Sequence, residues 1–581
     1  MSINEFGKGP GEFRVVGPPG TGKTEAAKDI AKDSATEYGF DKVLITSFSR
    51  SAAATIAARA DIPEENVGTL HHFGKRLLEK GQKLYDSGDF LKKFNAKYPH
   101  YAITPGRRNI DNDDGGSFGG DDEGGGELMG KREILMGNLT PEEVWPERVL
   151  HFHMAWEGAK QEAGVIDFQD MMTAAYETEC APENPKVIIV DEAQDFSRQQ
   201  VEIVRRWGKY AEQIYFIGDD DQVLYDWRGA SSDAMMLPVL EDWRYRYLSQ
   251  SYRVPRQVHS SAMAWIGQIN PAHRLHKDYK PRDFEGSARA VGYASYKNPG
   301  RLVEDALDHI SEGRDVMFIA SCRNMLLPLT NVLRRNGIAY GNKYVPKNYG
   351  WNPLRNDTAL MKGVLAFLCG VTHPKGFPDP KGWNVSCLKA LAKCLKDKGV
   401  NHWEQSLIGD DGKDLPDNAL VTERTLQFVF SEEKLTELYD ALDLASTGEG
   451  WPLGFFRNNL AAEHTDKKKV ASAIGKFEYI ENVIERSKAQ ALVEPPRITV
   501  GTIHSVKGGE ADVVYLFPDL SKPQKEDWDG WNGVGEFGKE NLIRLFYVAM
   551  TRAKQHLVVA ASDSKSWGTA DLWRYMDPQH G

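Results

Sequence analysis

The chain has 581 residues, of which 41% are hydrophobic and 27% charged, and its formal net charge at pH 7 is −11. This length is enough for about four domains, each with a buried core. No apolar run approaches the roughly 20 residues that cross a bilayer, which argues against a membrane role. The acidic balance excludes a uniformly basic protein that coats a polyanion, so any such binding must be local.

The N-terminal segment and the cysteines indicate the compartment. Met1 to Gly11 has neither the basic and apolar pattern of an export signal nor an Arg-rich amphipathic pattern. The five cysteines are odd in number and form no CxxC pair, which argues against a disulfide framework and against zinc. We therefore expect a cytoplasmic protein with reduced thiols.

Short apolar runs predict a first parallel sheet. The run Phe13 to Val16 leads through a Gly-rich turn into a helical pattern over Thr24 to Ala35, which is the strand, loop and helix order of a nucleotide-binding α/β unit. Three further runs, each short and nearly continuously apolar, are expected to be strands buried on both faces. These runs are Lys42 to Ser47, Lys186 to Val190 and Gln213 to Ile217.

A second set of β-rich runs predicts a second α/β domain. The set consists of Val316 to Ala320, Ile498 to Thr502, Val513 to Phe517 and His556 to Ala560. Two long segments with a mostly helical pattern, residues 75–170 and 355–495, are each interpreted as an insertion into a host domain.

The first insertion contains an acidic, Gly-rich stretch. Asp111 to Glu127 holds seven acidic residues, seven glycines and no aliphatic residue. Such a composition cannot bury enough apolar area to offset its ordering entropy, so we predict a disordered loop over residues 107–132. It is either a solvated tether or an acidic mimic of a nucleic-acid strand.

The turn after the first run fits the pattern GxxxxGK[ST] between a strand and a helix. Its backbone N–H groups can point at phosphates, Lys23 can reach the β- and γ-phosphate oxygens, and the Thr24 hydroxyl can bind Mg²⁺. We expect this loop to bind a nucleoside triphosphate. Its residues are Gly17, Pro18, Pro19, Gly20, Thr21, Gly22, Lys23 and Thr24.

Two carboxylates follow the apolar run that ends at Val190, at the sheet edge where the phosphate loop also lies. We expect Asp191 to bind Mg²⁺ and Glu192 to orient and deprotonate the attacking water, because phosphoryl transfer depends on positioning and charge neutralisation. The alternative is an acidic helix N-terminus that the helix dipole favours.

Several motifs in a fixed order carry a family resemblance. GDDDQVLYDWRGA, residues 218–230, is similar to the third motif of the UvrD/Rep/PcrA-type helicases of superfamily 1A, and DEAQD, residues 191–195, is similar to their second. The others follow in the family's order: TSFSRSAAATIA (46–57), GTLHHFG (68–74), LSQSYRVP (248–255), GTIHSVKGGEADVVY (501–515) and RLFYVAMTRAK (544–554). The chain therefore resembles a UvrD/Rep/PcrA-like superfamily 1A DNA helicase.

This resemblance implies an α/β fold with two RecA-like parallel-sheet P-loop domains, each with a largely helical insertion. The implied boundaries are 1–74 and 171–245 for the ATP-binding domain 1A, 75–170 for insertion 1B, 246–354 and 496–581 for domain 2A, and 355–495 for insertion 2B.

The resemblance also implies roles for residues around the nucleotide. Gln222 is expected to sense the γ-phosphate, and Arg253 and Arg552 to neutralise it, since a guanidinium stays charged and pairs with phosphate oxygens. Tyr252 is expected to stack on adenine and Glu510 to bind the ribose. ATP and Mg²⁺ are the implied cofactors, and ATP would bridge the two α/β domains.

A second group of residues resembles the family's single-strand groove. Phe48, Tyr225 and Trp227 are expected to stack on bases, which tolerates any sequence. Four neighbours are expected to contact phosphates or to couple the two sites: Thr69, His71, Arg228 and His504. Taken singly, a histidine or tyrosine of this kind is more often a structural residue.

The leading hypothesis is an ATP-dependent helicase that moves 3′ to 5′ on single-stranded DNA and unwinds duplex at single-strand/double-strand junctions. We expect it to be a monomer. It would act in the cytoplasm or at the nucleoid, or in the cytoplasm of a host cell if a virus encodes it. The alternatives are a DNA-dependent ATPase that removes or remodels proteins on DNA, and an unrelated P-loop kinase. The family's upstream glutamine is missing, since none of the twelve residues before Phe13 is Gln. The sequence therefore does not decide whether ATP is preferred over other nucleotides. It also does not decide between RNA and DNA as the bound strand, or between repair and replication as the pathway.

Overall fold

The computed structural model describes residues 6–7, 9–48, 53, 56, 61–78, 83–85, 88–103, 124–225, 229–342, 385–392, 414–416, 418–447, 479, 482–483, 486–487, 495–530, 536–563 and 568–576. The chain forms two compact units. Unit 1 consists of residues 1–293, 319–322 and 502–581, and unit 2 consists of residues 294–318 and 323–501.

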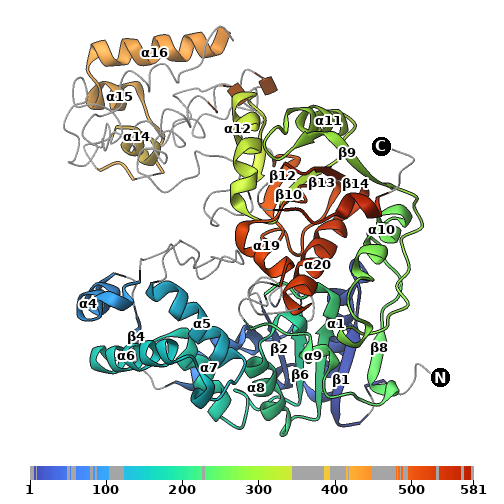
Figure 1. Cartoon of the computed structure of the whole chain (residues 1–581). Coiled ribbons are helices and arrows are strands. Elements are labelled where there is room, and N and C mark those ends of the chain that lie inside the picture. Colours follow the sequence, from blue (N-terminus) through green and yellow to red (C-terminus); the bar gives the residue numbers. More distant parts are fainter. Residues whose placement is uncertain are drawn as a thin grey trace. The chain divides into compact units, whose positions relative to one another are not determined.

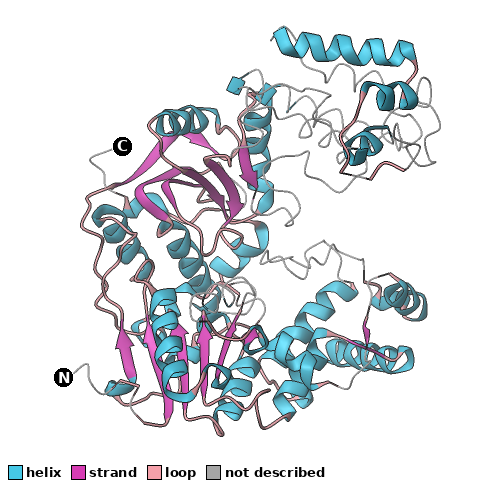
Figure 2. Ribbon diagram, turned by 180° about the vertical axis from the view of Figure 1, so that it is seen from behind, coloured by secondary structure: helices cyan, strands magenta, loops and turns pink. Residues whose placement is uncertain are grey.

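The first sheet lies in unit 1 and has six parallel strands (Figure 2). In spatial order they are β3 (Val67–Gly68), β2 (Val43–Ser47), β6 (Val187–Asp191), β7 (Gln213–Gly218), β1 (Gly11–Val16) and β8 (Tyr245–Tyr247). The four strands predicted from the first set of apolar runs are confirmed. Their central members are buried on both faces, which is why these runs are almost continuously apolar.

Each face of this sheet is covered by helices. On one face, Val43 and Ile45 of β2 pack with Val187 and Ile189 of β6 against the helix α1 (Lys23–Tyr38). The alternate residues face the other side and pack against α3 (Leu70–Leu77), α7 (Phe168–Glu177) and α8 (Arg198–Gly208). The carboxyl ends of β1, β2, β6 and β7 therefore meet at one edge, beside the start of α1.

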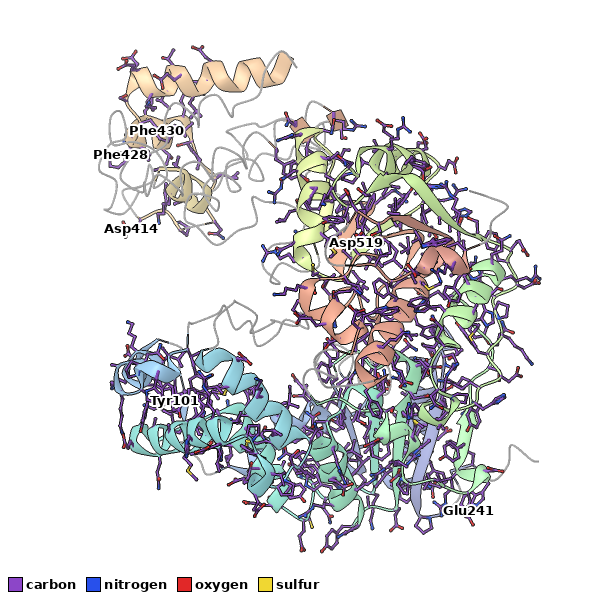
Figure 3. The ribbon with its side chains drawn as sticks, viewed as in Figure 1. Tyr101, Glu241, Asp414, Phe428, Phe430 and Asp519 are labelled. Carbon is purple, nitrogen blue, oxygen red and sulfur yellow. The ribbon has the colours of Figure 1, made fainter. Side chains whose placement is uncertain are left out.

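The second sheet contains the four strands predicted from the second set, and the predicted α/β class is confirmed. Its spatial order is β11 (Tyr340–Asn342), β12 (Ile498–Thr502), β10 (Val316–Ala320), β13 (Ala511–Leu516), β14 (Ala553–Ala561) and β9 (Ser287–Ser295). β11 pairs with β12, and β13 with β14, in parallel. Asp519, which follows β13, has a buried side chain, and its backbone carbonyl accepts a hydrogen bond from Ser321 Oγ at 2.9 Å (Figure 3).

Shorter elements complete the described chain (Figure 1). A small parallel pair is formed by β4 (Lys83–Leu84) and β5 (Val165–Ile166). The remaining helices of unit 1 are α4 (Asp89–Lys97), α5 (Gly125–Gly137), α6 (Glu147–Ala163), α9 (Asp233–Met236), α10 (Arg256–Ile266), α19 (Lys522–Trp528) and α20 (Glu536–Met550). Unit 2 contains α11 (Gly300–Ser311), α12 (Leu327–Arg335), α14 (Val385–Ala392), α15 (Glu423–Val429) and α16 (Glu432–Thr447). Within the described residues, no helix combines the length and apolar character that a membrane span requires.

One sequence-based expectation is wrong in part. The disordered loop was predicted over residues 107–132, but α5 begins at Gly125, while residues 104–123 lie outside the described residues. The reason is tertiary: Leu128 and Met129 are buried against α6. Arg132 is also buried and is paired with Glu157 and Asp167. The few apolar residues at the end of the segment therefore supply enough burial to form a helix.

The helices α4, α5 and α6 share an aromatic core. Trp156 is fully buried and packs edge-on against Phe90 and Phe94, with ring centroids 5.2 and 5.0 Å away. Its Nε1 donates to Asp167 Oδ2 at 2.8 Å. Tyr101 closes one side of this core with its ring 5.6 Å from that of Phe152 (Figure 3).

Trp156→Ala is expected to lower the free energy of unfolding of this insertion by about 3–5 kcal/mol, because it opens a cavity and removes one of the buried donors to the Asp167 carboxylate. Met154→Ala on the same helix is the control, since Met154 is 59% exposed. Urea denaturation followed by circular dichroism measures both. Equal midpoints for the two variants would contradict the assigned core.

Candidate active site

The phosphate-loop residues form the connection between β1 and α1. Gly22 is the N-cap of α1 in a left-handed conformation, and Gly20 also has a positive φ of 75°. The Gly17 N–H donates to the carbonyl of Gly218 at the end of β7, at 2.9 Å. Lys23 Nζ donates to the Gly17 carbonyl at 2.8 Å, and Thr24 lies exposed in the first turn of α1. The loop therefore presents a helix N-terminus and an ammonium group, which together suit an anion.

The predicted carboxylate pair lies at the end of β6. Burial, together with the charge of Glu192, raises the pKa of Asp191 to about 7. Burial would raise the pKa of Glu192 as well, but the charges of Lys507 and Lys23 outweigh it and hold that pKa at about 2. Glu192 has a φ of 52°, in the left-handed region that favours glycine. At neutral pH Glu192 is thus an ionised acceptor, whereas Asp191 would gain from a cation.

The residues present fit a magnesium ion. Asp191 Oδ1 and Ser47 Oγ are both buried without a hydrogen-bond partner among the described residues. Ser47 is the register partner of Asp191 in the neighbouring strand, and both continue the face of the sheet that packs on α1. Thr24, at the start of α1, adds a second hydroxyl. Carboxylate and hydroxyl oxygens are the ligands that a hard cation prefers.

A chain of hydrogen bonds joins Glu192 to Gln222. Gln194 Nε2 donates to Glu192 Oε2 at 2.6 Å, and Gln194 Oε1 accepts from the Asp219 N–H at 3.1 Å. Asp219 Oδ2 in turn accepts from Gln222 Nε2 at 2.7 Å. Gln222 Oε1 accepts from Arg552 Nη2 at 3.3 Å. Five residues from three separate parts of the chain therefore form one largely buried polar network.

Three cations crowd the same place. Arg253 Nε pairs with Glu510 Oε2 at 2.6 Å. Burial and the nearby charge of Arg253 lower the pKa of Arg552 to about 9. Burial is also the main cause that lowers the pKa of Lys23, and Arg253 adds to it. A bound polyanion would relieve this cost of buried positive charge, so the arrangement suits a triphosphate.

The Tyr252 side chain is 73% exposed, while its backbone N–H donates to the Gly20 carbonyl at 2.8 Å. This bond fixes the segment Ser251 to Arg253 against the phosphate loop. Ser251 Oγ adds a bond to the Pro19 carbonyl at 3.0 Å. The exposed ring beside the loop is in keeping with the expected stacking on a base, a role that stays a proposal.

The residues expected to contact DNA fall into two places. The Phe48 and Tyr225 rings are stacked on each other with centroids 4.5 Å apart, and Tyr225 is only 1% exposed. His504 lies beside them, with its ring 6.0 Å from that of Tyr225. Thr69 is the N-cap of α3, where its side chain accepts from the His72 N–H. His71 contacts the edge of Phe168 at 5.7 Å.

Two residues of that group, Trp227 and Arg228, lie outside the described residues. The structure instead adds one that the sequence-based reasoning did not select. Lys507 Nζ bonds to Asp195, lies 3.3 Å from the Gln222 carbonyl and 4.0 Å from Glu192 Oε2, and sits 5.4 Å from the centre of the Tyr225 ring. Lys507 lies within the motif GTIHSVKGGEADVVY, but the motif by itself does not indicate a role for this lysine.

A phosphate loop, a carboxylate pair at the neighbouring strand end and arginines from a second α/β region define a P-loop nucleotide hydrolase of the motor class. The comparisons with known proteins narrow this class. Residues 11–228 match the family model described as "AAA domain", and residues 458–564 match "UvrD-like helicase C-terminal domain".

Several curated proteins match between 64% and 98% of this chain. A "Probable DNA helicase II homolog" of Mycoplasma pneumoniae is 23% identical over 89% of this chain and 76% of its own length. A "Putative ATP-dependent DNA helicase YjcD" of Bacillus subtilis is 22% identical over 98% of this chain and 79% of its own. The "ATP-dependent DNA helicase PcrA" of Bacillus subtilis is 24% identical over 64% and 54%. Together, these matches support a UvrD-like helicase of superfamily 1A.

Gly20→Ala is expected to disturb the contact between the phosphate loop and Arg253, because a Cβ there would lie 2.5 Å from Arg253 Cβ and 3.2 Å from its backbone N. Gly9→Ala is the matched control, since Gly9 also has a positive φ but nothing within 4 Å of an added Cβ. Both variants carry the left-handed strain of about 1–2 kcal/mol. Thermal unfolding should therefore show a clearly larger loss for Gly20→Ala, and equal midpoints would count against the close approach.

Proposed function

We propose that this helicase couples Mg-ATP hydrolysis, stimulated by single-stranded DNA, to 3′–5′ movement along that strand and to unwinding of the duplex ahead. The observation that carries the proposal is the buried network that links Glu192 to Gln222 and Arg552. It connects a water-orienting carboxylate with a γ-phosphate sensor and a charge-neutralising arginine, which is the set that phosphoryl transfer needs.

In this proposal the nucleotide is held by residues of both α/β regions. The backbone of the phosphate loop and Lys23 bind the phosphates, and Thr24 and Asp191 hold the magnesium ion. The bound ion would neutralise phosphate charge. Glu192, ionised at neutral pH, orients the attacking water. Arg253 and Arg552 stabilise charge that develops on the leaving phosphate.

The base and the sugar engage residues at the open side of the site. Tyr252 stacks on the base with its exposed ring. Glu510 binds the ribose, and because it now pairs with Arg253, nucleotide binding would free that guanidinium for the phosphates. ATP is the proposed nucleotide, in keeping with the names of the relatives.

For the strand, the stacked rings of Phe48 and Tyr225 separate to admit a base, and Trp227 adds a further stacking surface. Thr69, His71, Arg228 and His504 line the strand or couple it to the nucleotide. Stacking of this kind contributes roughly 1–3 kcal/mol per base and does not depend on sequence. Single-stranded DNA and junctions are therefore the proposed partners of a monomer in the cytoplasm or nucleoid, with the 1A, 1B, 2A and 2B division given above.

Lys23→Ala is expected to abolish ATP hydrolysis, because it removes the ammonium that faces the phosphates. Glu192→Gln should hydrolyse ATP at least ~100-fold more slowly and yet bind ATP and DNA, since the amide keeps the shape but loses the charge that orients the water. Steady-state ATPase rates and binding of a fluorescent ATP analogue measure the two effects. Hydrolysis by Glu192→Gln at the wild-type rate would show that another group orients the water.

The direction of movement is tested with duplexes that carry a single-stranded tail on one side only. We expect unwinding from a 3′ tail and none from a 5′ tail, with ATPase activity stimulated by either. Unwinding only from the 5′ tail would overturn the polarity. DNA-stimulated ATPase without strand separation would instead favour a motor that removes proteins from DNA.

A further inference from the structure

Lys277 occupies an unusual position in the segment after α10. Its side chain is 5% exposed, and its Nζ lies 2.6 Å from Asp219 Oδ1, 2.7 Å from Asp220 Oδ1 and 2.7 Å from Asp221 Oδ2. The three carboxylates are themselves buried. One ammonium group thus binds three consecutive carboxylates in a place that water does not reach.

The three aspartates differ in their other partners. Asp221 receives two bonds from the fork of Arg274, at 3.1 and 2.6 Å. Asp220 Oδ2 accepts from the Leu275 N–H at 2.8 Å. Among the hydrogen bonds of the described residues, the Asp219 carboxylate has Lys277 Nζ and the Asp221 N–H on Oδ1, at 2.6 and 3.3 Å, and Gln222 on Oδ2. Of the three aspartates, Asp219 is therefore the one whose carboxylate accepts a hydrogen bond from a residue of the candidate active site, Gln222.

The geometry of Asp219 fixes Gln222 in a single orientation. A carboxylate held on one oxygen by an ammonium has its other oxygen fixed in direction, and Gln222 Nε2 donates to that oxygen at 2.7 Å. The Gln222 amide must then turn its oxygen the other way, where Arg552 Nη2 donates to it at 3.3 Å. The backbone N–H of Asp219 donates to Gln194, and Gln194 in turn donates to Glu192.

Lys277 remains charged in this setting. Burial alone would lower its pKa, but the charges of Asp219, Asp220 and Asp221 raise that pKa well above its ordinary value. The cluster also receives Arg544 of α20, whose Nε donates to the Asp220 carbonyl at 3.1 Å.

We propose that Lys277 is a positioning residue of the nucleotide site, whose ammonium orients Asp219 so that Asp219 directs Gln222 towards Arg552. This inference rests on the proposed ATPase function. Lys277 itself touches no reacting atom in this account, and its effect passes through Asp219 and Gln222.

The test compares Lys277→Met with Lys277→Arg in the full-length protein, using ATP hydrolysis stimulated by single-stranded DNA. Lys277→Met should lower kcat by about tenfold or more and change the KM for ATP by less than about threefold, because the phosphate loop and the base contacts keep their own supports. Lys277→Arg, which keeps the charge, should retain more of kcat than Lys277→Met. Lys186→Met is the control, since the Lys186 side chain is half-exposed and, within the part of the chain that the structure describes, pairs with Glu212 at 3.0 Å.

A double-mutant cycle separates positioning from a general loss of structure. In a Gln222→Ala background, Lys277→Met should cause little further loss of kcat, because the residue through which it acts is gone. Fold-losses that multiply in the double variant would overturn the proposal. If Lys277→Met fails to fold, Asp219→Asn takes its place in the same cycle, and wild-type kcat in a folded Asp219→Asn variant would overturn it equally.

The two claims fail in different ways. A wild-type protein without DNA-stimulated ATPase would remove the proposed function and this inference with it. An active wild type whose kcat is unchanged in Lys277→Met would remove only the role of Lys277.

Discussion

The turn after β7 places three carboxylates, Asp219 to Asp221, where water cannot solvate them. Buried charges must be paired, because an unpaired one costs several kcal/mol. The chain meets this constraint with Lys277 and Arg274 from one segment and a backbone N–H from Leu275. The electrostatics of one short turn thereby hold the segment after α10 against the first sheet, and with it the polar groups that surround the nucleotide site.

The same site also holds positively charged groups away from water. Lys23 and Arg552 both have lowered pKa values, chiefly because they are buried, and Arg253 adds repulsion to each. Such an arrangement holds free energy that an anion can release on binding. Asp191 has a raised pKa and a carboxylate oxygen without a partner among the described residues. A bound cation would stabilise the ionised form of this carboxylate. A metal-bound polyanion would stabilise both the buried cations and the Asp191 carboxylate.

Lys507 gives the nucleotide residues a direct physical link to the stacked rings of Phe48 and Tyr225. It contacts Asp195 and the Gln222 carbonyl on one side and faces the Tyr225 ring on the other. A shift of Glu192 or Gln222 would therefore be felt at Tyr225 through a single side chain.

The sequence by itself determined the strands, the phosphate loop and the carboxylate pair, because apolar runs, glycines at positive φ and residues at strand ends obey local rules. It also gave the order of the motifs. It did not determine that residues 125–132 fold as a helix, since that depends on the burial of Leu128 and Met129 against α6. Nor did it indicate Lys277, Gln194 or Ser47. Their importance comes from neighbours 25 to 144 residues away in the chain, and such contacts exist only once the tertiary structure has removed water from between them.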